Sequence, residues 1–282
     1  MPSRQASDVM KIKGNFMREK FSYDKYLDFI EKDELEANKY KNQFIPDRLY
    51  KYQPIGSGQM RAKRIQTIKK EQIWASRVKY LNDPFEFKML YADQKNNNVR
   101  EFYEDVLNRN EIICLSSKWN DKLMWAHYAE SHTGMCIEYA FLHGGKGQVT
   151  PVTYVANRQC FDDELKVWLK NKNLALEQML KQNEINGVQR RQLHSCGKIM
   201  YTKDSVWKYE KEYRIVYPLD ENSKGMNVPI HRLGMRTSRI VAGINCSEDN
   251  KKKLNEISNS LGLGNVYTSR IHPEQYTIDY VR

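Results

Sequence analysis

The order of apolar and polar positions predicts a chain in which short strands and helices are mixed. Strand patterns consist of alternating or continuous β-branched and aromatic residues that are bounded by turn residues. Between about Phe161 and Gln192, apolar residues recur at three- and four-residue steps, which is typical of a long helix with one packing face. Strands are expected at 48–53, 72–76, 111–115, 134–141, 150–155, 208–218, 228–233, 238–244 and 266–271, and further helices at 23–41, 58–70, 122–131 and 247–261.

This mixture favours an α+β fold with a mixed, largely antiparallel sheet. Residues 1–47 are expected to form a basic N-terminal lead and a helix. Residues 48–282 are expected to form a single α+β domain with a helical insertion at about 161–202. The sequence contains no internal repeat and no long linker, so one domain is the simplest organisation.

The predicted strand at 208–218, KYEKEYRIVYP, has charged residues at its centre. Because side chains alternate along a strand, Glu210, Glu212 and Arg214 would share one face. If that face is exposed to water, the charges form a surface ion pair that contributes little to stability. If it is the floor of a site, a carboxylate next to a cation can stabilise developing positive charge or act as a general base.

Composition restricts the class of protein and of partner. The net charge of +11 favours an anionic partner such as nucleic acid, a phosphorylated cofactor or an acidic surface, although solubility alone accounts for it equally well. No apolar run approaches the length of a membrane span and the N-terminus lacks the pattern of a secretory signal. The five cysteines are dispersed and none forms a CxxC pair, so a cytoplasmic location is expected.

Common catalytic and metal-binding motifs are absent. GGKG at 144–147 lacks the spacing of a phosphate-binding loop and is expected to be a turn. No GxSxG motif is present. His127 and His132 are five residues apart and therefore do not fit a HExxH zinc motif, so no metal site is expected.

Two polar stretches are candidates for ligand contact. Asn82 and Asp83 precede a proline between aromatic residues, which indicates either a turn that bonds its own backbone or a loop that holds a ligand. Trp125, His127 and Tyr128 lie on a predicted helix, where adjacent positions diverge by about 100°. At least one of these three side chains should therefore be exposed or line a cavity.

Four stretches in order resemble the bacterial domain of unknown function 2971 family. They include the elements NDPF (82–85), MWAHYAESHTGMCIE (124–138) and YEKEYR (209–214), which are specific as a set. The resemblance covers most of residues 49–244 and leaves out residues 1–47 and the end of the chain. It implies a conditional effector of bacterial mobile elements or phage defence, with a triggering or neutralising protein partner.

A weaker resemblance is to ADP-ribosyltransferases, particularly toxins that modify DNA or RNA. It implies an NAD cleft between two small sheets and an essential glutamate on a late strand, which would be Glu212 or Glu210. The family has a histidine or arginine on its first strand, where this chain has Lys51 and Tyr52. The family's serine corresponds to Ser76, Ser116 or Ser117, and Asn82 and Asp83 would cover NAD. Pyrophosphate contacts would come from Arg214, Lys51 or Arg77, stacking from Tyr52, Tyr80 or Trp125, and His127 is a further cofactor-binding candidate.

Three functional hypotheses follow. The first is an ADP-ribosyltransferase-like effector that uses NAD and acts on nucleic acid. The second is a sensor that binds nucleic acid or a phage protein without chemistry. The third is a nuclease-like effector, which the scattered acidic residues disfavour.

Overall fold

A computed structural model describes residues 20–83, 85–86, 90–91, 110–157, 159–160, 186–218 and 225–281 of the chain. Within these residues the α-helices are α1 (Tyr23–Lys32), α2 (Glu34–Asn42), α3 (Gly58–Lys69), α5 (Lys122–Tyr128), α7 (Gly187–Cys196) and α8 (Glu248–Ser260). The strands are β1 (Arg48–Gln53), β2 (Gln72–Arg77), β3 (Leu90–Tyr91), β4 (Asn110–Ser116), β5 (Met135–Phe141), β6 (Thr150–Pro151), β7 (Thr153–Val155), β8 (Gln159–Cys160), β9 (Thr202–Asp204), β10 (Glu212–Pro218), β11 (Gly225–Pro229), β12 (Met235–Ala242), β13 (Tyr267–Ile271) and β14 (Ile278–Val281).

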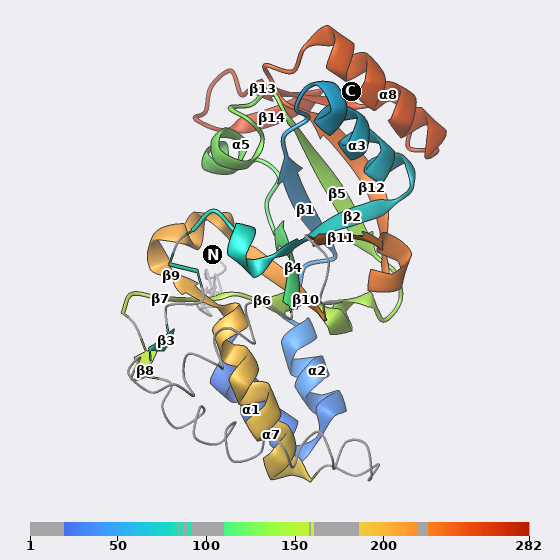
Figure 1. Cartoon of the computed structure of the whole chain (residues 1–282). Helices are drawn as coiled ribbons and strands as arrows, with labels where there is room; N and C mark the ends of the chain where they lie inside the picture. Colours follow the sequence, from blue (N-terminus) through green and yellow to red (C-terminus); the bar gives the residue numbers. More distant parts are fainter. Residues whose placement is uncertain are drawn as a thin grey trace, which may run out of the picture.

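A ten-stranded sheet forms the centre of the described part of the molecule (Figure 1). Its main path runs β11-β2-β4-β1-β5-β12-β13-β14, and β10 lies between β4 and β6 off that path. Among these strands only β12 and β13 are paired in parallel. The fold is therefore a single α+β domain with a mixed, largely antiparallel sheet, as the sequence predicts.

Strand β4 is the point at which the sheet divides. One edge of β4 pairs with β10 along its whole length, from Asn110 to Ser116. The other edge is shared, because β2 pairs with β4 near Ile112 and β1 pairs with it only at Ser116. Strands β1 and β2 thus separate beside the middle of β4, and the separation creates space for a pocket within the sheet.

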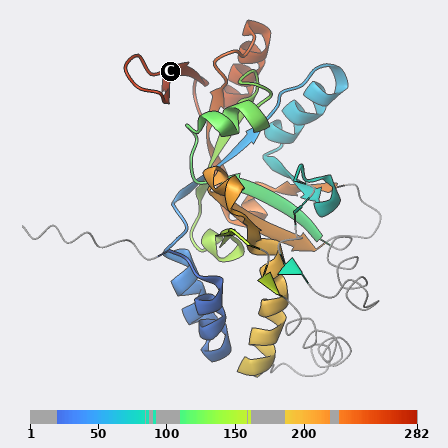
Figure 2. The ribbon, with the colours of Figure 1, turned by 90° about the vertical axis from the view of Figure 1, so that its left-hand side faces the viewer.

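Helices α1, α2 and α7 pack together at one end of the molecule, and α3 and α8 lie at the other (Figures 1 and 2). Tyrosine and phenylalanine side chains fill the contact between the N-terminal helices, with Ile30 fully buried. The Tyr23 hydroxyl donates to the His194 carbonyl of α7 at 2.9 Å. The N-terminal helices and the C-terminal part of the predicted helical insertion therefore form one helical layer, although most of the predicted 161–192 helix lies outside the described residues.

Local structure differs from the sequence prediction mainly at 208–218. Only Glu212–Pro218 is a strand, and Ser205–Glu210 forms the 3₁₀ helix η4. Lys211 joins them in the left-handed conformation, with φ +46°. The continuous strand was wrong because the aromatic and charged spacing of WKYEK fits a tight 3₁₀ turn as well as a strand. Glu210 therefore reaches the site from a turn, and not from the strand that carries Glu212.

Smaller differences occur near the C-terminus. The strand predicted at 228–233 ends at Pro229 and continues as a 3₁₀ helix, and β14 was not expected. Among the described residues, no helix combines the length and apolar character needed to cross a membrane.

Candidate functional site

A pocket of about 160 Å³ lies where β1 and β2 separate. Strand β1 contributes Tyr50, Lys51 and Tyr52, and β4 contributes its middle residues. Near this separation the Lys51 ammonium donates to the Cys114 backbone carbonyl at 3.3 Å. The remaining walls come from Ser76, Leu81, Asn82, Glu86, Met124, Tyr128, Lys203, Glu210 and Glu212.

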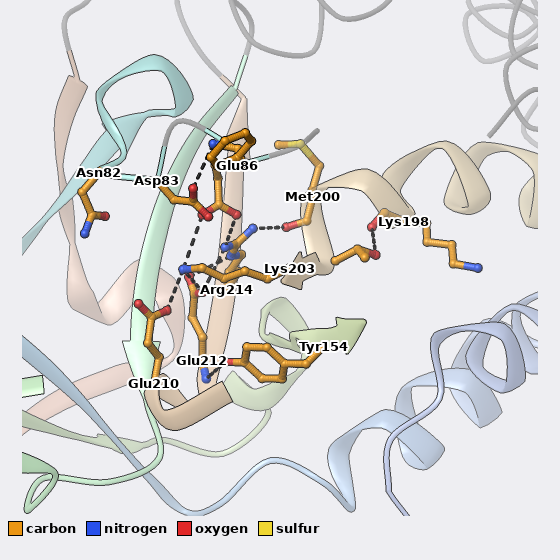
Figure 3. Close-up of polar contacts among 12 residues, drawn as sticks. Asn82, Asp83, Glu86, Tyr154, Lys198, Met200, Lys203, Glu210, Glu212 and Arg214 are labelled. Atoms are coloured by element: carbon orange, nitrogen blue, oxygen red, sulfur yellow. Dashed lines mark hydrogen bonds and ion pairs between the residues drawn. The ribbon is translucent and has the colours of Figure 1, made fainter. Parts of the chain in front are cut away.

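Five charged side chains form a buried cluster on one wall of the pocket (Figure 3). The Arg214 guanidinium is fully buried and donates to both Glu212 oxygens, at 2.8 and 2.9 Å, and to Glu86 at 2.6 Å. The Lys203 ammonium contacts one oxygen of each of Glu86, Glu210 and Glu212, at 3.4, 2.6 and 3.1 Å. Three carboxylates thus share two cations, which compensates for much of the cost of burying charge.

Glu212 is held as a permanent anion. Its burial opposes ionisation, but the adjacent Arg214 and Lys203 keep the pKa of its carboxyl well below the usual range. Its backbone N–H donates to the Tyr154 hydroxyl at 2.8 Å, which fixes the start of β10. Glu212 can therefore supply constant negative charge to the pocket, whereas it is poorly suited to accepting a proton near neutral pH.

Glu210 has the opposite character. Burial raises the pKa of its carboxyl to about 7, although Lys203 opposes this effect, and the negative charge of Glu212 adds to it. One carboxylate oxygen accepts from Lys203 at 2.6 Å and the other from the Tyr128 hydroxyl. Tyr128 in turn accepts a hydrogen bond from the Asn82 amide at 3.1 Å. Glu210 is thus poised to exchange a proton near neutral pH, as a general acid or base requires.

The electrostatics of Glu210 predict a pH-dependent stability. The pKa in the folded protein, about 7, lies above the ordinary value of 4.5, so folding favours the protonated form. This stabilisation is fully present below pH 4.5 and is lost as the pH rises through 7. The loss amounts to about 3 kcal/mol in the free energy of unfolding. Urea unfolding at pH 5 and pH 8 should show this loss in the wild type and not in Glu210→Gln. Equal pH dependence in the two proteins would contradict the assignment.

Lys51 and Cys114 line the same pocket beside this cluster. Desolvation lowers the pKa of the Lys51 ammonium, and Cys114 and Glu212 oppose that shift. Burial raises the pKa of the Cys114 thiol, so the thiol stays protonated. The pocket therefore contains an amine able to donate hydrogen bonds and an unreactive thiol.

The structure brings together eight of the residues that the sequence singles out. These residues, which all line the one pocket, are Lys51, Tyr52, Ser76, Asn82, Ser116, Tyr128, Glu210 and Glu212. The Ser116 hydroxyl donates to the Glu210 carbonyl at 2.7 Å, so it helps to position that residue.

Other predicted residues lie outside the pocket. Trp125 is completely buried beneath Tyr52, with ring centroids 5.3 Å apart, and its indole N–H donates to the Trp119 carbonyl. It therefore supports Tyr52 and cannot stack on a ligand. Arg214 is saturated by carboxylates and by the Met200 carbonyl at 2.8 Å, so it cannot hold a pyrophosphate group. These two expected ligand contacts are wrong because burial, which the sequence does not reveal, occupies both side chains.

Three more predicted residues have other positions. Asp83 is buried and accepts a hydrogen bond from the Phe85 backbone N–H at 2.9 Å, which is the self-bonded turn that the sequence allows. Arg77 is half-buried at the end of β2 and does not line the pocket. His127 is exposed and lies beside Tyr209, with ring centroids 6.0 Å apart, outside the pocket.

Sequence reasoning missed Lys203 and did not assign Glu86 to the site, whereas it named Tyr128 as one of three helix residues of which at least one should be exposed or line a cavity. Lys203 lies on the short strand β9 among ordinary polar residues, so no local pattern distinguishes it. Glu86 is the only acidic residue between two aromatic residues in NDPFEF, and this pattern could have indicated a carboxylate that faces the protein interior. Among the described residues, no group of histidine, cysteine and acidic side chains could hold a metal ion. The three site carboxylates instead surround the Lys203 ammonium.

Comparison with known proteins finds one family. No curated protein and no solved structure matches the chain. Residues 124–215 match the model of a family described as protein of unknown function, DUF2971. The matched segment begins in α5, ends in β10 and includes Tyr128, Lys203, Glu210, Glu212 and Arg214. This part of the chain, which supplies most of the charged wall of the pocket, is therefore similar to the DUF2971 family.

Proposed function

We propose that the protein is a cytoplasmic ADP-ribosyltransferase-like effector that uses NAD as its substrate and modifies nucleic acid, in a setting such as phage defence. The observation that carries this proposal is the pairing, in one pocket, of Glu210, whose pKa is about 7, with the permanently ionised Glu212. Two carboxylates with separated pKa values are the arrangement that enzymes use to divide acid–base and electrostatic roles.

The size and charge of the pocket fit one end of NAD. Pockets for whole drug-sized ligands occupy about 300–1,000 Å³. A cavity of about 160 Å³ accommodates a single ring-sized group. The negative wall suits the cationic nicotinamide ring and its ribose, and the Lys51 ammonium can donate to a ribose hydroxyl. The rest of the dinucleotide would then lie at the mouth of the pocket.

The reaction divides between the two glutamates. Transfer breaks the bond between ribose C1′ and the nicotinamide nitrogen, and nicotinamide leaves as a neutral molecule with the bonding electrons. Glu212 would stabilise the positive charge that develops on the ribose as this bond weakens. Glu210 would accept the proton of the attacking hydroxyl or amino group as that group bonds to C1′. Tyr128 and Lys203 hold Glu210 in position for this step.

The direct test is release of nicotinamide. Purified protein is incubated with NAD alone, with single-stranded or duplex nucleic acid, and with bacterial cell extract, and free nicotinamide is measured by chromatography. We expect nicotinamide to accumulate, and mass to be added to an acceptor when one is present. If no nicotinamide appears under any of these conditions, the transferase proposal fails.

A non-catalytic sensor is the second hypothesis. It predicts that Glu210→Gln and Glu212→Gln leave ligand binding unchanged, whereas neutralising basic residues abolishes it. A third, nuclease-like, hypothesis predicts cleavage of nucleic acid that stops when divalent metal is chelated. The triggering or neutralising protein partner stays a prediction under each hypothesis.

A further inference from the structure

A row of aromatic side chains runs along the surface next to the pocket. His127 of α5 lies beside Tyr209, and Tyr209 lies beside Trp207, with 6.0 Å between ring centroids in each pair. The Lys203 ammonium, which is in the charged wall, lies 5.2 Å from the centre of the Trp207 ring. We call His127, Tyr209 and Trp207 the aromatic row. Trp207 brings the row close to Lys203, which lines the pocket.

The rings of the aromatic row are accessible to solvent. His127 is exposed, and Trp207 and Tyr209 are half-buried. Val206, in the same 3₁₀ helix, is 68% exposed. Tyr209 also packs against the buried cluster that contains Trp125, so the two rings are held in place while part of each residue stays accessible. Their exposure beside a pocket favours contact with a planar ligand.

A group of lysines follows the same 3₁₀ helix. The side chains of Lys211 and Lys118 contact each other, and both residues are exposed. Lys208 is also exposed, and its backbone carbonyl accepts a hydrogen bond from the Lys211 backbone N–H at 3.3 Å. We call Lys118, Lys208 and Lys211 the lysine group. Like charges this close repel each other unless an anion lies between them.

One carboxylate offsets part of the charge of the lysine group. Asp121 acts on Lys211, and its carboxylate also caps α5 by accepting from the Leu123 and Met124 backbone N–H groups. Glu210, although adjacent in sequence to Lys211, points into the buried cluster toward Lys203 (Figure 3). The lysine group therefore presents positive charge next to the aromatic row.

From this arrangement we infer that η4 and the end of α5 form a binding site for single-stranded nucleic acid, in which bases stack on the aromatic row and phosphates contact the lysine group. Aromatic stacking surfaces beside a positive groove are how proteins bind single strands without sequence preference. A duplex cannot use the aromatic row, because its bases are stacked within the helix. The role of this strand as the acceptor rests on the proposed transferase function, whereas the binding can be measured without NAD.

The test uses fluorescence anisotropy with labelled dT and rU oligonucleotides of about 12 nucleotides, and with a duplex of equal length, in the absence of NAD. We expect single strands to bind about tenfold more tightly than the duplex, and Trp207→Ala to weaken single-strand binding about tenfold. Trp207→Phe should restore most of the affinity. The control is Leu35→Ala, which removes an apolar side chain that is 70% exposed on α2, in the N-terminal helical layer.

A charge-matched pair tests the lysine group. Lys208→Glu should weaken binding. The slope of log affinity against log salt concentration should become shallower by about 1, which corresponds to the loss of one phosphate contact. Lys32→Glu at the end of α1 makes the same change in net charge at an exposed position and should have a smaller effect. His127→Ala removes the exposed ring without disturbing the core and should weaken binding several-fold, even if Trp207→Ala does not fold.

The inference is overturned if Trp207→Ala and His127→Ala bind as Leu35→Ala does, or if the duplex binds as tightly as the single strand. Its failure is distinguishable from failure of the transferase. If the variants of the aromatic row lose binding and no protein releases nicotinamide, the nucleic-acid site is supported and the transferase proposal fails. If nicotinamide is released and the variants bind as the wild type does, only the nucleic-acid site fails.

Discussion

Replacing Arg214 with methionine is expected to destabilise the fold by about 3–5 kcal/mol, because it leaves buried carboxylates without their cation. Arg214 is fully buried and donates to both oxygens of Glu212 and to Glu86. Methionine fills a similar volume, so the loss arises from unpaired charge and not from a cavity. A change of this size is a large fraction of the 5–15 kcal/mol that stabilises a typical domain. The measurement is the urea midpoint at pH 7, with the slope of the transition checked for change.

Two further variants separate the electrostatic cause from a general loss of packing. Arg270→Met removes an arginine whose ion pair with Asp279 is solvent-exposed, so its urea midpoint should move little. Adding Glu212→Gln and Glu86→Gln to Arg214→Met removes the orphaned charges and should recover part of the lost stability. If Arg214→Met is no less stable than Arg270→Met, the buried cluster does not contribute as described.

Glu210→Gln is expected to lower the rate of nicotinamide release by about 10²–10⁴-fold while the protein stays folded. Glutamine keeps the shape of the side chain and its contacts with Tyr128 and Lys203, but it cannot accept a proton. The wild-type rate should rise with pH through about 7 as Glu210 loses its proton, and the residual rate of Glu210→Gln should lack that rise. Steady-state rates between pH 5.5 and 8.5 provide the measurement.

Neighbouring substitutions distinguish the roles of the two glutamates. Glu212→Gln should lower both the rate and the urea midpoint, because it removes a counter-ion of Arg214. Its residual rate should keep the rise but at lower pH, because the negative charge of Glu212 raises the pKa of Glu210. Tyr128→Phe removes a hydrogen bond that lowers the pKa of Glu210, so the rise should move to higher pH. A fully active Glu210→Gln beside an inactive, folded Glu212→Gln would reverse the two roles.

Much of the fold could be predicted from local patterns. The strand at 48–53 was predicted with its observed bounds, and the strands β2, β4 and β5 and the helix α8 within two residues at each end. These elements have strong periodicity and clear turn residues on both sides, so local preference and tertiary context agree. The segment at 208–218 failed because aromatic and charged residues at short spacing do not distinguish a strand from a 3₁₀ turn. The domain boundaries stay predictions.

The candidate site was predicted in its residue types and only partly in its geometry. Glu210, Glu212, Lys51, Tyr52, Ser76 and Asn82 were expected near one ligand, and they line one pocket. Arg214 was expected in the same place but as a ligand contact, whereas it is the buried counter-ion of Glu212. Lys203 was absent from the prediction because it lies on a different strand, and the distance between strands in space does not follow their separation in the sequence.

The sequence by itself determined the α+β class, the strands that border the pocket, and the set of charged residues that could supply chemistry. Those features depend on side-chain periodicity and on residue type, which are local. Only the tertiary structure decided which glutamate is free to exchange a proton. The sheet divides at β4, and Lys211 adopts the left-handed conformation. In this arrangement Lys203 and Arg214 both contact Glu212, whereas Glu210 contacts Lys203 and Tyr128. A pKa depends on burial and on neighbouring charges, and both are set by the fold.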